Sequence, residues 1–149
     1  MPVDASDEEW RTWADTLPLA AGFDVRCICL APGSGEFVVE SSPISVNPNG
    51  AVHGGVVAAV IDHALGVVCV RMVHAGDGVA TASLNIDYYR PCVLPMRLSV
   101  SVQRSGRTVV FARVQVTGAD GELYAEASGV MSVRPSREAR RALERSRLP

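Results

Sequence analysis

The chain has 149 residues, 48% of them hydrophobic, which is enough for one sizeable core but not for two. Its 14 basic and 16 acidic residues give a formal net charge of -2 and are spread along the sequence, which argues against nucleic acid as a partner. The sequence contains no lysine, so catalysis through a lysine Schiff base is excluded.

The N-terminal segment, residues 1–22, is expected to form a helix. Ser6 can cap it, the acidic residues that follow suit the positive end of the helix dipole, and Pro18 should end it. The first residues lack the basic and then apolar order of a secretory signal, so we expect a cytoplasmic protein. The longest apolar stretch, residues 56–70, is interrupted by Asp62 and is too short to span a membrane.

The middle of the chain predicts a hairpin, a loop and a buried helix. Strands are expected at Val25–Leu30 and Phe37–Glu40, with a turn rich in glycine between them, and an irregular loop follows at Ser41–Gly50. From Gly55 to about Val73 the residues are apolar on nearly all sides, so this helix should be enclosed by other structure.

Four alternating, β-branched runs follow and predict antiparallel strands at Val79–Tyr89, Arg97–Arg104, Thr108–Val116 and Glu122–Val133. The economical arrangement is an α+β fold in which a curved antiparallel β-sheet is wrapped around the long central α-helix. We expect one domain over residues 1–149, ending in a charged tail at 136–149 to which we assign no function.

The loop before the long helix carries a specific combination of residues. It reads Asn47-Pro48-Asn49-Gly50-Ala51-Val52-His53-Gly54-Gly55, and Asp62 and the run Leu84-Asn85-Ile86-Asp87-Tyr88-Tyr89-Arg90-Pro91 follow it. From about Asn47 to Val133 the chain resembles the phenylacetate-degradation type of hotdog acyl-CoA thioesterases, in the 4-hydroxybenzoyl-CoA thioesterase superfamily. The resemblance implies the hotdog fold and hydrolysis of acyl-CoA thioesters to free acid and coenzyme A.

The resemblance also implies the active-site residues. In that family the loop asparagine, the glycine after the histidine and the helical aspartate belong to the active site, which implies Asn47, Gly54 and Asp62 here. Thr81 falls where the family often has a hydroxyl that orients the attacking water.

Two of these positions have competitors, because the strand register and the loop alignment are uncertain by a residue or two in a single sequence. Asn49 competes with Asn47 for the loop position, and Ser83 competes with Thr81 for the strand position. We rank Asn47 and Thr81 first.

The residue types suit cleavage of a thioester. Gly54 and Gly55 open the helix, where the first backbone amides have no intrahelical partner and the dipole favours negative charge. Asp62 is a carboxylate midway along an apolar helix, where an unpaired charge needs a polar cavity or a catalytic role. The sequence leaves open whether Asp62 activates water or forms an acyl-enzyme anhydride.

The spacing along the helix predicts self-association. Gly54 and Asp62 are eight positions apart, so they lie roughly 12 Å apart along the helix axis and one carbonyl group cannot readily touch both. The simplest site takes Gly54 from one subunit and Asp62 from its two-fold mate. The family resemblance implies the same homodimer, and commonly a dimer of dimers.

The remaining candidates surround this centre. We expect His53 to orient the loop, and His63, which points about 100° away from Asp62, to be structural or at the subunit interface. Arg90 and Arg107 are the candidates for binding the phosphates of coenzyme A. The residues that can line the acyl pocket, or equally be plain core, are Val56, Val57, Leu84 and Tyr88.

Two other functions compete with hydrolysis. A hotdog hydratase or dehydratase would use a pair of catalytic side chains on its helix, and a regulator that binds acyl-CoA would have the pocket without the carboxylate. No three of Asp62 and the histidines His53, His63 and His74 have metal-ligand spacing, and the cysteines lack zinc-knuckle spacing, so we expect no metal. No cofactor is expected, because coenzyme A is part of the substrate.

Overall fold

The structure of the protein, a computed structural model, describes residues 5–42 and 46–136 of the chain. Two short helices, α1 (Asp7–Asp15) and α2 (Pro18–Phe23), come first. The strands β1 (Val25–Ala31) and β2 (Ser34–Val39) lead to the long helix α3 (Gly54–Val70). The fold ends with the strands β3 (Gly78–Tyr88), β4 (Met96–Ser105), β5 (Val109–Gly118) and β6 (Leu123–Arg134).

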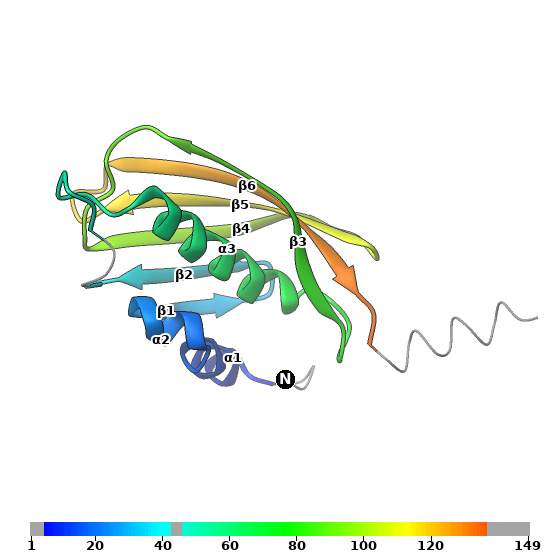
Figure 1. Cartoon of the computed structure of the whole chain (residues 1–149). Coiled ribbons are helices and arrows are strands. Elements are labelled where there is room, and N and C mark those ends of the chain that lie inside the picture. Colours follow the sequence, from blue (N-terminus) through cyan, green and yellow to red (C-terminus); the bar gives the residue numbers. More distant parts are fainter. Residues whose placement is uncertain (1–4, 43–45, 137–149) are drawn as a thin grey trace, which may run out of the picture.

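The six strands form one antiparallel sheet in the order β1-β2-β4-β5-β6-β3. The sheet curves around α3, which lies along its concave face, and α1 and α2 lie beside β1 (Figure 1). The predicted α+β hotdog fold is thereby confirmed. The sheet is not closed, because β1 and β3 are its two ends.

Helix α3 packs tightly on the sheet through one side. Its buried residues are Val57, Val60, Ile61, Ala64, Leu65, Val67, Val68 and Cys69. Two strand glycines permit the close approach: a Cβ on Gly35 would lie 2.8 Å from Val68 Cγ2, and one on Gly129 would lie 2.7 Å from Leu65 Cδ1. The contact between helix and sheet therefore depends on the absence of side chains at these glycines.

The prediction that other structure encloses α3 is met in part by the single chain, where the sheet and α2 pack against it. The sheet covers only one side of the helix, so Val56, Ala58, Ala59 and Val70 keep partial exposure. Val56 and Val70 nevertheless pack against the core with part of their surface.

The N-terminal segment differs from the single predicted helix. The first helix ends before Pro18, as predicted, but Pro18 then starts a second helix, because proline fits the first helical position, where no amide donor is needed. Strand β2 starts at Ser34, earlier than the predicted Phe37, because Pro32 and Gly33 alone make the turn. Residues 1–4 and the predicted tail from residue 137 onward lie outside the described residues.

Gly35→Ala should destabilise the protein, because the added Cβ would lie 2.8 Å from Val68 Cγ2 and 3.1 Å from Leu30 Cδ1 in a packed core. We expect the free energy of unfolding to fall by about 1–3 kcal/mol, the usual cost of overpacking, in a denaturant titration. Gly78→Ala is the matched control, since Gly78 also lies in a strand and a Cβ there meets nothing within 4 Å. Equal stability of the two variants would contradict tight packing of α3 on β2.

Candidate active site

Asp62 lies midway along α3, and its side chain reaches β3 at the end of the sheet. Its Oδ1 accepts a hydrogen bond of 2.5 Å from the Thr81 hydroxyl, and the residue is partly exposed to solvent. Among the residues that the structure describes, Thr81 is the one hydrogen-bond partner of Asp62. The structure thus brings together two residues that the sequence assigned to one site, and Oδ2 remains open to a substrate or a water molecule.

A bulge in β3 determines which of the two candidate hydroxyls, that of Thr81 or that of Ser83, faces α3. Thr81 pairs with Met131, whose side chain is buried on the face toward α3. The register shifts between Thr81 and Ser83, and Ser83 pairs with Val130 on the opposite face of the sheet. Of the two hydroxyls, only that of Thr81 therefore faces the helix that carries Asp62.

The first turn of α3 leaves one backbone amide free. His53 is the N-cap residue, and its Nδ1 accepts a hydrogen bond of 3.0 Å from the Gly55 amide. The amides of Val56 and Val57 reach the His53 carbonyl oxygen at 2.8 and 3.1 Å. Within the described part of the chain the Gly54 amide has no partner. Gly54 can therefore bind a negative oxygen, whereas the Gly55 amide, which the sequence grouped with it, is occupied.

Tyr88 connects the end of β3 to the same helix terminus. Its hydroxyl donates a hydrogen bond of 2.7 Å to the Gly54 carbonyl oxygen, and its ring lies 3.7 Å from where a Cβ on Gly54 would be. Burial raises the pKa of the Tyr88 hydroxyl above its usual value, so the group is a neutral donor at physiological pH. The sequence proposed Tyr88 as a pocket residue. The structure shows that Tyr88 contacts Gly54, the residue whose backbone amide is free.

Asn47 organises the loop that precedes α3. Its Oδ1 accepts hydrogen bonds from the amides of Asn49, at 2.8 Å, and Ala51, at 3.3 Å, and its own amide donates to the Ala51 carbonyl oxygen at 2.7 Å. Asn49 contributes a backbone amide to this turn and is exposed. Of the two competing asparagines, Asn47 therefore has the side chain that fixes the loop.

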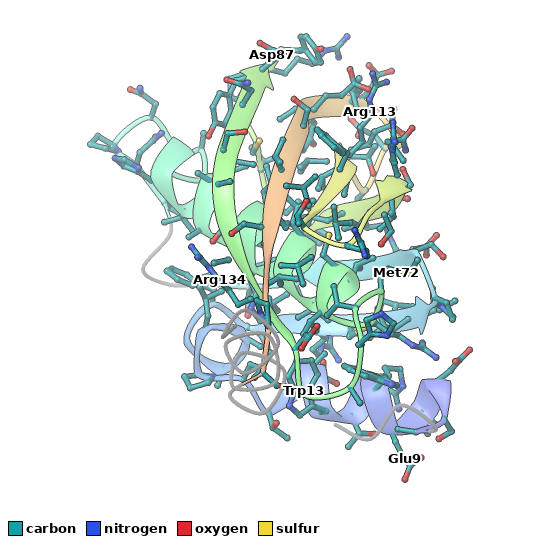
Figure 2. All side chains as sticks on the ribbon, turned by 90° about the vertical axis from the view of Figure 1, so that its right-hand side faces the viewer. Glu9, Trp13, Met72, Asp87, Arg113 and Arg134 are labelled. Carbon is teal, nitrogen blue, oxygen red and sulfur yellow. The ribbon has the colours of Figure 1, made fainter. Side chains whose placement is uncertain are left out.

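The two candidate arginines lie at opposite ends of α3. Arg90 follows β3 at the N-terminal end of the helix, where it forms an exposed ion pair of 2.8 Å with Glu122. Arg107 lies in the hairpin between β4 and β5 and lines a hollow of about 270 Å³ with Met72, which follows α3 and is labelled in Figure 2. Within one chain the structure does not bring the two arginines together.

His63 does not pair with Asp62, its neighbour in sequence. Its Nε2 is buried and has no hydrogen-bond partner in the described residues. Burial lowers the pKa of His63, and the nearby Asp62 carboxylate opposes this effect. A catalytic pair of Asp62 and His63 is therefore absent from the described structure.

The two described ranges of the chain are residues 5–42 and 46–136. No group of three histidine, cysteine or acidic side chains in these ranges could hold a metal ion. No helix in them is long and apolar enough to cross a membrane.

The chain is similar in sequence to known proteins. The sequence profile of the Thioesterase superfamily matches residues 49–125, from the loop before α3 to the start of β6. A Saccharolobus solfataricus protein with an esterase name is 30% identical over 107 residues, which are 71% of this chain and 76% of the relative.

Two solved structures share the fold at low sequence identity. The E. coli PaaI protein from the phenylacetic acid degradation operon superposes with a TM-score of 0.75 at 16% identity, covering 84% of this chain and 89% of that one. A Streptococcus pneumoniae protein named as a thioesterase, solved with coenzyme A, gives a TM-score of 0.71 at 22% identity, covering 78% of this chain and 91% of that one.

His63 should titrate below the ordinary histidine pKa of about 6.5, because burial disfavours the charged ring. In Asp62→Asn its pKa should fall further, since the opposing carboxylate is gone; ring-proton NMR measures both values. The unfolded chain then binds more protons than the folded one, so the stability present above about pH 6.5 is lost as the pH falls through the folded-state pKa. A His63 pKa at or above the ordinary value would contradict this assignment.

Proposed function

The chain belongs to the thioesterase superfamily, and we propose that it hydrolyses acyl-CoA thioesters to the free acid and coenzyme A. The observation that carries the proposal is the contact between the partly exposed Asp62 carboxylate and the Thr81 hydroxyl, on a helix whose first amide, at Gly54, is free. Hydrolysis of a thioester needs a group that activates water or attacks directly, and a donor for the charge that grows on the carbonyl oxygen. Asp62 and Gly54 supply these two functions.

Asp62 can act by either of two routes. As a general base it takes a proton from water, and the resulting hydroxide forms the new C–O bond with the carbonyl carbon. The C–S bond then breaks, and the leaving coenzyme A thiolate takes up the proton from Asp62. As a nucleophile its carboxylate forms a mixed anhydride while the thiolate leaves, and water then hydrolyses the anhydride. In both routes the Thr81 hydroxyl fixes one carboxylate oxygen, so that the other faces the substrate or the water.

The substrate class is proposed from the sequence motif and from two relatives. The S. pneumoniae protein was solved with coenzyme A, and E. coli PaaI comes from the phenylacetic acid degradation operon. From these two likenesses we propose that this chain is a coenzyme A thioesterase of the phenylacetate-degradation type. Val56 and Tyr88, at the N-terminal end of α3, would line the acyl pocket.

The phosphates of coenzyme A would bind to arginine. Arg90 and Arg107 lie at opposite ends of α3, so a single molecule of coenzyme A would meet only one of them within a subunit. The exposed pair of Arg90 with Glu122 leaves Arg90 able to change partner, because such surface pairs contribute little to stability.

The complete site requires two subunits. The edge of β3 that faces away from β6 has no partner strand among the described residues, and apolar residues of α3 stay partly exposed beside it. We infer that two subunits pair through this edge, so that Gly54 of one subunit faces Asp62 of the other. Two such dimers would then form a tetramer.

The competing functions are less well supported. A hydratase or dehydratase would need a second side chain acting with Asp62, but Nε2 of the adjacent His63 is buried and forms no hydrogen bond with it. A regulator that only binds acyl-CoA would have no need of a carboxylate held by Thr81 in an otherwise apolar helix.

Asp62→Asn should lower the rate of thiol release from acyl-CoA by about 100-fold or more, because the amide can neither take a proton from water nor attack the carbonyl carbon. The assay uses short, medium, long and aromatic acyl-CoAs. Asp87→Asn is the matched control: Asp87, labelled at the end of β3 in Figure 2, is exposed and pairs in register with Glu126. Unchanged thiol release by Asp62→Asn would overturn the proposed function.

The two-subunit site predicts complementation between inactive variants. Gly54→Val should be inactive because its side chain blocks the free amide, and Asp62→Asn should be inactive because it lacks the carboxylate. A hybrid dimer of the two keeps one intact site, so unfolding and refolding an equal mixture should recover about a quarter of the wild-type activity. Each variant refolded alone is the control. No recovery by a mixture that forms hybrid dimers would assign both residues to the same subunit.

A further inference from the structure

Tyr88 and His53 hold the two ends of one peptide group. The Tyr88 hydroxyl donates to the Gly54 carbonyl oxygen at 2.7 Å, and the Gly55 amide donates to His53 Nδ1 at 3.0 Å. This carbonyl and this amide belong to the same planar unit, the peptide between Gly54 and Gly55. The free Gly54 amide belongs to the preceding peptide, which is joined to this one at the Gly54 Cα.

A pair of glycines needs such support. Glycine has the largest conformational freedom of any residue, and the first turn of a helix frays more readily than its middle. A donor stabilises a developing oxyanion best when it already points at the oxygen, so that no reorganisation is needed during the reaction. The peptide that carries the Gly54 amide is held at its other end, because the His53 carbonyl oxygen accepts from the Val56 and Val57 amides. Contacts to the next peptide would add a second restraint on the direction of the Gly54 amide.

We propose that Tyr88 and His53 are positioning residues which together form a peptide clamp that fixes the direction of the free Gly54 amide. This inference rests on the proposed function, since it assumes that the Gly54 amide binds the thioester carbonyl. It also assigns His53 a role other than general base, because its Nδ1 already accepts a hydrogen bond from the Gly55 amide. The single hydroxyl proton of Tyr88 is likewise directed at the Gly54 carbonyl oxygen.

Tyr88→Phe tests the clamp from the sheet side, since it removes the hydroxyl and keeps the ring. We expect kcat to fall about tenfold, because a misdirected oxyanion donor loses transition-state stabilisation, while KM changes by less than about twofold. Tyr89→Phe is the matched control, because the Tyr89 hydroxyl donates to Glu126 at 3.0 Å and Tyr89 is similarly exposed. It should retain wild-type kcat.

The N-cap side is tested with two variants at His53. His53→Ala removes the acceptor for the Gly55 amide and should lower kcat by a similar factor. His53→Asn should restore most of it, because asparagine is a strong N-cap acceptor, although it cannot act as a general base. Since both changes release the same peptide, His53→Ala combined with Tyr88→Phe should lose far less than the product of the two single effects.

Thermal unfolding and amide hydrogen exchange separate positioning from plain destabilisation. The clamp predicts faster exchange at the hydrogen-bonded Gly55 amide in Tyr88→Phe, with a melting temperature close to that of Tyr89→Phe. A wild-type kcat in Tyr88→Phe, a loss confined to KM, or failure of His53→Asn to restore kcat would each overturn the clamp. These outcomes leave the proposed function standing if Asp62→Asn is inactive, whereas an active Asp62→Asn would overturn the function itself.

Discussion

The position of the site follows from one constraint: a carboxylate on an apolar helix cannot lie against the sheet. The sheet-facing residues of α3, such as Val60, Ile61 and Leu65, are fully buried, and an ionised group among them would lose its hydration without replacement. Asp62 therefore lies on the flank of the helix that faces β3, where Thr81 donates a hydrogen bond and solvent reaches the second oxygen. The Asp62 carboxylate is consequently at the edge of the sheet and outside the core.

The edge position has consequences for the strand and for assembly. A bulge between Thr81 and Ser83 turns the Thr81 hydroxyl toward α3 while the strand keeps its pairing with β6. The opposite side of β3 has unpaired backbone groups in the described chain, and exposed edges of this kind are usually covered or paired. A two-fold partner at β3 would pair this edge, cover the apolar flank of α3 and supply the second half of the proposed site.

The fold could be predicted from the sequence because its signals are local. Alternating strands and an apolar helix leave few arrangements, and the pairing of Asp62 with Thr81 agrees with the residues ranked first. The start of α2 at Pro18 was missed because proline ends one helix and begins another equally well. The contact between Tyr88 and Gly54 could not be predicted, because it depends on where β3 ends relative to α3. That relation is a matter of packing, which residue spacing does not encode.

The glycines at the start of α3 combine two requirements that normally conflict. Access to a backbone amide favours residues without side chains, whereas a fixed donor direction favours residues with restricted backbones. A Cβ on Gly54 would lie 3.7 Å from the Tyr88 ring, which is ordinary van der Waals contact, so the absence of a side chain matters for the approach of a carbonyl to the amide and not for packing against Tyr88. Part of the rigidity that glycine lacks comes from the first-turn hydrogen bonds to the His53 carbonyl oxygen, and part from the hydroxyl of Tyr88 and the ring nitrogen of His53. The Tyr88 hydroxyl, which phenylalanine lacks, thus makes a specific contact at the start of α3.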